Sequence, residues 1–166
     1  FRSEGREEEA LKAEAFAVQS LFKMAMACAK DEMLDSAVES LKRASELAGK
    51  SSDAFGIRLH LGLFHMEAGR WRDGEEAFKE VLALCERYGK APWEFTGSPS
   101  EIILGIEEAR KSAWYRLAEC QDKQGKVQEA IKSLQECLAV DPRFSLAHFS
   151  LGHFYYPCGA REVFTS

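Results

Sequence analysis

The stretch WYRLAECQDKQGKVQEAIKSLQECLAVDP, residues 114–142, decides the fold. Apolar residues recur at helical spacing on both sides of Gly125, which is expected in a turn where a positive φ is tolerated. Small residues lie at Ala118 and Ala130, 12 positions apart, and the large Leu134 follows four positions later. This spacing predicts two antiparallel helices, because small residues let two backbones approach closely while large side chains fill the remaining space.

The same spacing occurs three times along the chain. A small residue is followed by a second small residue after 12 positions and by a large apolar residue after 16. The three sets are Ala25, Ala37 and Leu41; Gly62, Gly74 and Phe78; and Ala118, Ala130 and Leu134. Adding 34 to Leu117 and Gly125 gives Leu151 and Gly159, so a further partial copy follows. Recurrence of the same internal spacing predicts stacked helical hairpins that share one core.

These residues resemble the tetratricopeptide repeat family, whose pattern is W-x-x-L-G-x-x-Y…A-x-x-x-F…A…P, and residues 114–142 match it best. The resemblance implies an all-α fold, a right-handed superhelical array of antiparallel helix pairs in a single domain over residues 1–166. Repeats are expected at 18–51, 55–88 and 111–144, with a half repeat at 145–156 and a C-terminal tail at 157–166. The first copy departs from the pattern, because Asp31 and Glu32 lie where the other copies have a turn glycine.

An insertion at 89–110 separates the second copy from the third, since their equivalent leucines are 56 = 34 + 22 positions apart. Its first part, 89–97, is predicted to be a loop because Gly, Pro and Thr cluster there. Residues 98–101, Ser-Pro-Ser-Glu, combine a capping serine, a proline at the first helical position and a glutamate that completes a capping box. A helix is therefore predicted over 99–123, and an extended first helix is predicted over 7–29.

Composition limits the function and the compartment. The chain has 166 residues, and its 22 basic and 27 acidic residues give a net charge of −5, which argues against a general nucleic-acid binder. No window approaches the roughly 18 uninterrupted apolar residues of a membrane helix, so a soluble protein without a membrane span is expected. The five cysteines form no C-x-x-C pair, which favours buried thiols in a reducing compartment, the cytoplasm or an organelle matrix or stroma. A chain that begins at Phe1 is expected to be a fragment or a processed form.

The resemblance also implies where a partner binds. In this family the first helix of each pair lines an inner groove that holds extended peptides or helices. Residues spaced by three or four positions point into the groove, and an apolar stripe there predicts a protein partner. The predicted partner-binding residues are Phe22, Met26, Leu59, Leu63, Met66, Tyr115, Arg116, Glu119, Phe149, His153 and Tyr156. The alternative is that the extended N-terminal helix or the tail fills the groove from within.

Two further features predict contacts. Trp93 and Phe95 are large aromatic residues in the expected loop, and they either bind a partner or fold back onto the extended helix. The half repeat at 145–156 is apolar, although repeat arrays normally finish with a polar capping helix. A partner or a second copy of the chain is therefore expected at this end.

No pattern of catalytic residues is present. The chain has no phosphate loop, nucleophile elbow or dinucleotide fingerprint. His60 and His65, like His148 and His153, are five residues apart, about 140° around a helix, which is poor geometry for a shared metal ion. No enzyme activity, cofactor or metal site is predicted.

The predicted function is a non-enzymatic protein–protein interaction scaffold or adaptor. One alternative is a structural subunit or assembly factor of a large complex, which would use convex faces and ends rather than the groove. A second alternative is a helical-repeat RNA binder. That function would need a basic inner face, whereas the predicted face carries Glu119 and Asp122.

Overall fold

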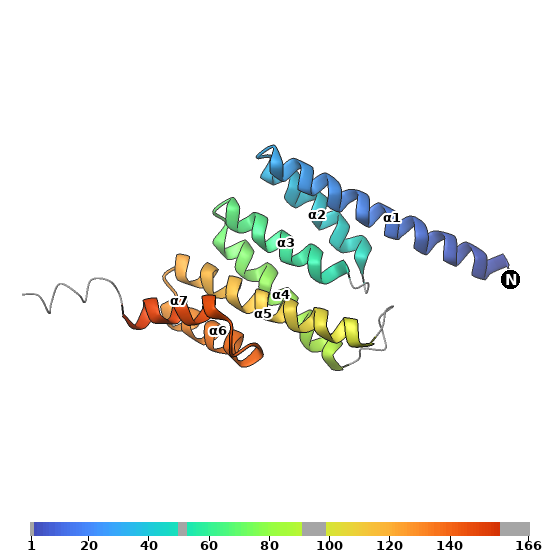
Figure 1. The fold of residues 1–166 in the computed structure, drawn as a ribbon. Coiled ribbons are helices and arrows are strands. Elements are labelled where there is room, and N and C mark those ends of the chain that lie inside the picture. The colour runs from blue at the N-terminus through green and yellow to red at the C-terminus, as the bar shows by residue number, and fades with distance from the viewer. Residues whose placement is uncertain (1, 50–52, 91–98, 157–166) are drawn as a thin grey trace, which may run out of the picture.

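The computed structural model describes residues 2–49, 53–90 and 99–156, and these residues form helices without any strand. The helices are α1 (Arg2–Lys30), α2 (Leu34–Ala48), α3 (Asp53–Glu67), α4 (Trp71–Lys90), α5 (Pro99–Lys123), α6 (Val127–Val140) and α7 (Ser145–Tyr155). Consecutive helices pack against one another as antiparallel hairpins, and α7 packs against α6 at the end of the stack (Figure 1). The predicted all-α array of helix pairs is confirmed.

The helix bounds agree closely with those expected from the sequence. The predicted helix over 99–123 is α5, and α1 extends further toward the N-terminus than the predicted 7–29. The expected loop at 89–97 begins too early, because α4 continues through Gly89 and Lys90. An ion pair between Lys90 and Glu86, 3.1 Å apart and one turn away, supports this last turn. Trp93 and Phe95 lie outside the described residues.

The turns within the hairpins need backbone conformations that glycine adopts easily. Gly69 and Gly125 have φ values of 71° and 77°, as their place between paired helices predicts. In the first hairpin Glu32 takes a φ of 59°, where a side chain costs roughly 1 kcal/mol. The first copy therefore forms the same turn without a glycine, and Glu32 takes the strained backbone conformation instead.

Each hairpin is held by a small residue facing a large one. In the second hairpin the ring of Phe78 lies so close to Gly62 that an added Cβ would be 2.6 Å from the ring. The first and third hairpins have Ala25 with Leu41 and Ala118 with Leu134 in the same cores, and all four are buried. Where the first helix carries alanine instead of glycine, the second helix thus carries leucine instead of the larger phenylalanine.

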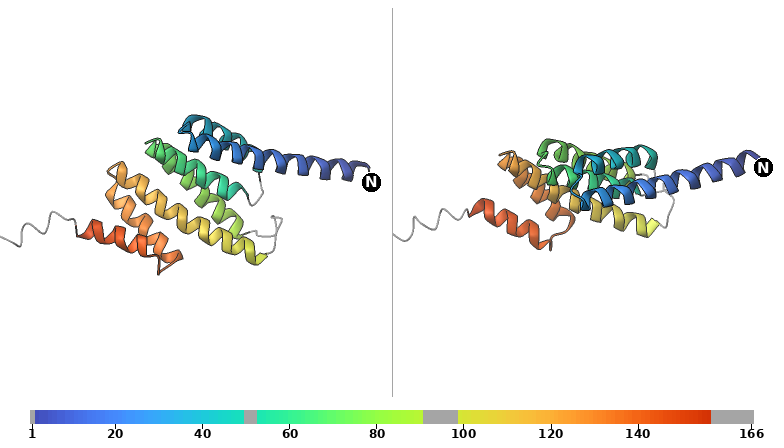
Figure 2. Two further views of the ribbon diagram at one scale, coloured as in Figure 1. Left: turned by 45° about the horizontal axis from the view of Figure 1, so that its top comes forward. Right: turned by 90° about the horizontal axis from the view of Figure 1, so that it is seen from above.

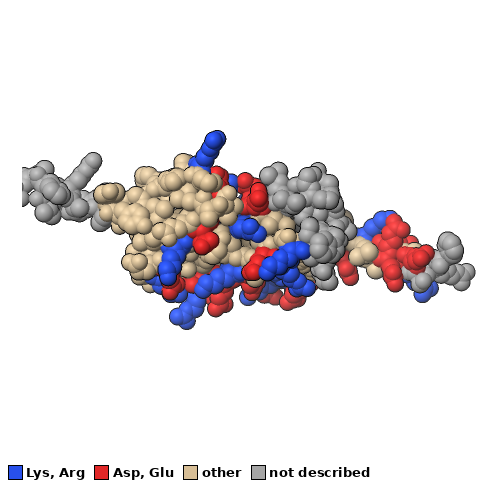
Figure 3. Space-filling view, turned by 90° about the horizontal axis from the view of Figure 1, so that it is seen from below, with Lys and Arg blue, Asp and Glu red and all other residues tan. Residues whose placement is uncertain are grey.

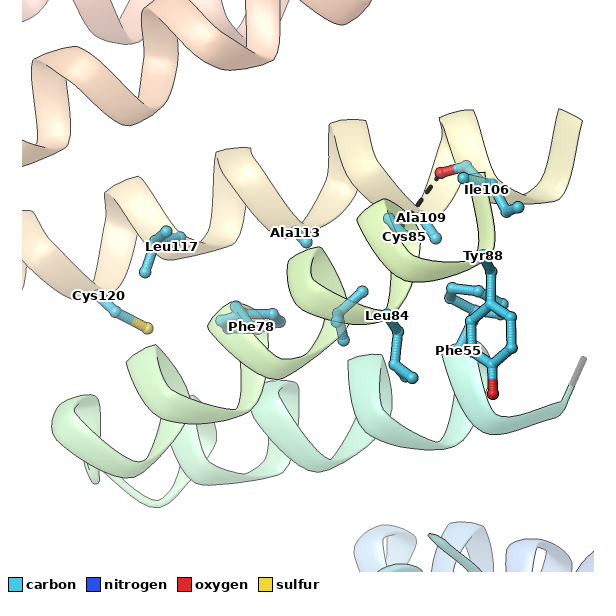
Figure 4. Close-up of a cluster of buried hydrophobic side chains, with 11 residues drawn as sticks. Phe55, Phe78, Leu84, Cys85, Tyr88, Ile106, Ala109, Ala113, Leu117 and Cys120 are labelled. Atoms are coloured by element: carbon cyan, nitrogen blue, oxygen red, sulfur yellow. Dashed lines mark hydrogen bonds between the residues drawn. The ribbon is translucent and has the colours of Figure 1, made fainter. Parts of the chain in front are cut away.

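The central core joins the second hairpin to the third. Phe55 of α3, Phe78 of α4 and Leu117 of α5 lie in one cluster of buried side chains (Figure 4). The thiol of Cys85 in α4 points at the backbone carbonyl of Ile106 in α5, with an S–O distance of 3.7 Å. Burial across three helices fixes the angle between the two hairpins and, with it, the surface formed by their first helices.

Charged links repeat along the turn side of the stack. Arg70, just before α4, pairs with Asp35 in the first turn of α2. Lys126, just before α6, donates to Glu75 in the first turns of α4 at 3.0 Å, and Gln124 donates to the same carboxylate at 2.7 Å. Each link ties the turn of one hairpin to the second helix of the hairpin before it.

Glu75 is the buried member of this set, with 3% of its surface exposed. Burial alone would raise the pKa of its carboxyl. Hydrogen bonds from Lys79, Lys126 and Gln124 outweigh this effect and lower the pKa to about 2. The carboxylate is therefore charged at neutral pH and holds two hairpins together.

Candidate functional site

The candidate site is the face formed by the first helices of the hairpins together with α7. Helices α1, α3, α5 and α7 follow one another across the array in Figures 1 and 2. The N-terminal half of α1 extends beyond the other helices instead of crossing this face, and the side chains of residues 4–16 are exposed. Within the described residues, the N-terminal helix therefore does not fill the groove.

A hollow of about 130 Å³ lies where α5, α6 and α7 meet. Its lining residues are Tyr115, Ala118, Glu119, Asp122, Leu134, Phe149, Ser150, His153 and Phe154. The structure thus brings together four of the predicted partner-binding residues, two from α5 and two from α7. Phe149 is 77% exposed, so most of this ring faces solvent.

The two sides of this hollow differ in chemistry. The α5 side carries the carboxylates of Glu119 and Asp122. Arg116 donates to Glu119 at 2.7 Å, and its guanidinium lies 5.6 Å from the centre of the Tyr115 ring. Among the described residues, the backbone carbonyl of Asp122 accepts from the N–H of Gly125, and its carboxylate has no hydrogen bond or ion pair. The α7 side offers aromatic rings and no Asp, Glu, Lys or Arg, because α7 contains none.

A second hollow of about 280 Å³ lies between α1 and α3. It is lined by Val18, Gln19, Phe22, Lys23, Asp53, Gly56 and Ile57. Phe22 is held by the edge-to-face ring of His60, with 5.0 Å between ring centres. His60 is itself fixed, because its Nδ1 donates to the carbonyl oxygen of Gly56 at 2.8 Å. Phe22 is the predicted partner-binding residue that this hollow contains.

Comparison with known proteins identifies one part of the site. Residues 112–144, from α5 through α6, match the tetratricopeptide repeat family. This segment is a tetratricopeptide repeat. Of the residues that line the hollow between α5 and α7, this repeat supplies Tyr115, Ala118, Glu119, Asp122 and Leu134. The predicted resemblance is confirmed.

The whole array resembles solved structures of MamA. One, a crystal structure of MamA, has a TM-score of 0.62 and 23% sequence identity, and the match covers 93% of this chain and 76% of that one. Another crystal structure of MamA protein has a TM-score of 0.61 and 23% identity over 97% of this chain and 78% of that one. At this identity the likeness shows the fold alone, a stacked array of paired helices. No curated protein matches the chain in sequence.

The remaining predicted residues have mixed surroundings. Leu59, Leu63 and Met66 are partly buried and pack against the central core, and Met26 packs against the first hairpin. The middle of the face is therefore anchored in the core, and both hollows lie away from it. Tyr156 follows α7 and is 82% exposed.

Sequence reasoning missed several lining residues. Lys23, Asp53, Ser150 and Phe154 were not among the predicted inner positions, although each lines a hollow. The reason is geometric, because a hollow between adjacent helices is lined by their facing flanks as well as by the residues that point straight inward. Lys23, Ser150 and Phe154 each follow a predicted residue by one position, and this adjacency is the signal that the sequence offers.

The titratable groups of the described residues give no cofactor site. No group of three or more His, Cys, Asp or Glu is arranged to hold a metal ion in these segments. Burial raises the pKa of the Cys120 thiol to about 12, and those of Cys85 and Cys137 to about 11. These three thiols are packing groups, as predicted. Of the described helices, none is long and apolar enough to cross a membrane.

Proposed function

We propose that this protein is a non-enzymatic interaction scaffold or adaptor, which binds a peptide or amphipathic helix of a partner protein on the face formed by α1, α3, α5 and α7. The tetratricopeptide repeat supports a role in protein interaction. The observation that carries the proposal is the hollow between α5 and α7, which the largely exposed Phe149 lines together with Glu119 and Asp122.

The chemistry of the hollow defines the ligand. Covering the exposed Phe149 ring would contribute about 2 kcal/mol, before the cost of association is subtracted. Asp122 favours a Lys or Arg side chain in the partner, since an acidic group would be repelled by it and by Glu119. The ligand is therefore an apolar segment with a basic residue beside it.

The test is a peptide selected against the full chain from a displayed library, with its dissociation constant measured by calorimetry for variants. Phe149→Ala should weaken binding about tenfold or more, and Asp122→Asn should weaken peptides that contain Lys or Arg. Phe16→Ala is the matched control, because Phe16 is similarly exposed, at 73%, but lies on the projecting part of α1. Selected peptides that bind equally well to the Phe149→Ala variant would contradict the proposal.

A second candidate function is a structural subunit or assembly factor of a larger complex. The exposed apolar end of the stack favours it, since Leu146, Phe149 and Tyr155 of α7 are each at least 50% exposed. Figure 3 shows the same end as an area almost without charged side chains. Stoichiometric co-purification that resists high salt would support this role, and weak binding that a peptide competes away would oppose it.

A further inference from the structure

His65 of α3 is a buried titratable residue whose ring lacks a hydrogen bond. It is 6% exposed, and its Nδ1 atom has no hydrogen-bond partner among the described residues. An oxygen of the half-exposed Asp73 carboxylate lies 3.9 Å from Nδ1, which is beyond hydrogen-bonding distance. Buried polar atoms in folded proteins nearly always have a partner, so this exception points to a role other than packing.

The internal repeat shows how the third hairpin differs at the same place. Gln121 occupies the position of His65, three residues after the small residue of the first helix. Ser133 occupies the position of Ala77 in the second helix. The hydroxyl of Ser133 donates to the side-chain oxygen of Gln121 at 2.6 Å. The second hairpin therefore has a titratable group where the third has an uncharged, hydrogen-bonded pair.

The charged groups around His65 lie on both sides of the contact between the first and second hairpins. Asp73 belongs to the same hairpin as His65, and so does Arg70, which pairs with Asp35 of α2. Lys42 belongs to α2, across the contact. Burial has the largest effect on the pKa of His65 and lowers it, whereas Asp73 raises this pKa. The cations of Arg70 and Lys42 lower it further, because they repel an imidazolium.

Lys42 lacks the partner that its equivalent has in the next hairpin. That equivalent is Lys79, whose ammonium group pairs with Glu75 at 2.6 Å, one turn earlier in α4. The residue one turn before Lys42 is the apolar Val38, and Lys42 makes no ion pair among the described residues. A positive charge on His65 would therefore meet a cation across the contact that no carboxylate neutralises.

The placement of these groups decides what protonation does to the contact. The carboxylate of Asp73 attracts an imidazolium and moves with it, because both belong to the second hairpin. The ammonium group of Lys42 repels it from the first hairpin, and separation of the hairpins would also admit water to the buried ring. The ion pair of Arg70 with Asp35 opposes separation, but its carboxylate is 90% exposed, so this restraint is weak.

We propose that His65 makes the contact between the first and second hairpins sensitive to pH, and that protonation of its imidazole loosens the packing of α2 against α3. The contact between the second and third hairpins stays closed over the same range. There Gln121 carries no charge, and Glu75, with a pKa of about 2, keeps its charge. The hollow between α1 and α3 lies at the contact that loosens. This property of the fold is independent of the proposed binding function.

The test is hydrogen exchange of the full chain, followed by mass spectrometry at about pH 7.5 and about pH 5.5, with each rate divided by the intrinsic rate at that pH. If His65 has its ordinary pKa of 6.5 once the contact opens, protonation favours opening by up to about tenfold at the lower pH. We expect the protection of α2 to fall by about threefold to tenfold, and that of α5 and α6 to change by less than about twofold.

A double variant removes the titratable group and keeps the packing. His65→Gln with Ala77→Ser reproduces the pair that Gln121 and Ser133 form in the third hairpin. This variant should lose the fall in protection of α2 at the lower pH. Its protection at about pH 7.5 reports whether it folds, because a disrupted contact would lower protection at that pH as well.

A second variant tests the repulsion across the contact. Lys42→Gln removes the cation of α2 that faces His65, and it should reduce the fall in protection. Arg43→Gln is the matched control, because Arg43 is also an exposed cation of α2 but pairs with Glu39 of the same helix. The control should leave the fall unchanged.

Three results would overturn the proposal. The first is equal protection of α2 at the two pH values. The second is a fall that persists in the double variant, which would assign it to another titratable group, such as His60 against Phe22 of α1. The third is a fall of equal size in α2, α5 and α6, which would show unfolding of the whole array instead of loosening at one contact.

Discussion

Exchange of the glycine–phenylalanine pair in the second hairpin for the alanine–leucine pair of the other hairpins tests the repeat geometry. Gly62→Ala alone adds a methyl group that would lie 2.6 Å from the Phe78 ring. Phe78→Leu alone leaves the space of a fully buried ring partly empty. In the double variant the added methyl group lies in the space that the ring occupied. The resulting alanine–leucine pair is the same as Ala118 and Leu134 in the core of the third hairpin.

The expected magnitudes follow from these contacts. Overpacking by Gly62→Ala costs about 1–3 kcal/mol, offset by about 1 kcal/mol from the higher helix propensity of alanine. Phe78→Leu costs about 1–2 kcal/mol through loss of buried contacts. The double variant avoids the overpacking and keeps the gain in propensity. Its unfolding free energy should therefore exceed the value expected from simple addition by about 1–3 kcal/mol.

The assay is urea unfolding of the full chain followed by helical circular dichroism, for the four members of the double-mutant cycle. Gly56→Ala, in the same helix but with open space around the added atom, is the matched control. It should show a coupling with Phe78→Leu below about 0.5 kcal/mol. A coupling this small for Gly62→Ala as well would refute the proposed equivalence of the three hairpins.

Three further predictions follow from the fold. The pKa of Glu75 is lower in the folded state than its usual value of 4.5, so its contribution is present above pH 4.5 and is lost as the pH falls toward about 2. The free energy of unfolding should fall by about 3 kcal/mol over this range in acid unfolding titrations, and Glu75→Gln should not show this fall. If the free energy of unfolding of Glu75→Gln depends on pH as that of the unaltered chain does, the link through Glu75 is contradicted. Burial lowers the pKa of His65, so stability should also fall as the pH drops below 6.5, and His65→Asn should remove this step in the same titrations. In the native protein, alkylation should modify the half-buried Cys28 and leave the buried Cys85, Cys120 and Cys137 unmodified. Mass spectrometry of the labelled peptides measures this, and fast labelling of native Cys120 would contradict its place in the core.

The sequence alone predicts the fold of this chain because the repeat shows each structural requirement more than once. Gly69 and Gly125 are both turn residues with positive φ, and Gly62 is the close contact that its spacing indicates. Helix α5 starts at Pro99, where the pattern of residues 98–101 predicts a helix start from adjacent residues alone. Features set by local sequence or by repetition could therefore be read directly.

The candidate site was predictable only in part. Tyr115, Glu119, Phe149 and His153 meet at one hollow because inward positions on neighbouring first helices face the same space. Phe154 and Lys23 were missed because the side chains that line a hollow depend on the distance and angle between helices, which the spacing within one helix does not define. For the same reason the hydrogen bond from Lys126 to Glu75 could not be predicted, because these residues belong to different hairpins and are 51 positions apart.

The most direct test of the interaction role is to find which surface of the full chain a partner touches. A photo-crosslinking amino acid can be placed at position 149 in the groove or at position 16 on the projecting part of α1. After irradiation in native extract, mass spectrometry identifies the cross-linked partner segments. We predict an apolar segment with a Lys or Arg beside it at position 149 and nothing specific at position 16. Specific cross-links at position 16 alone, with none at position 149, would contradict the assignment of this face as the binding site.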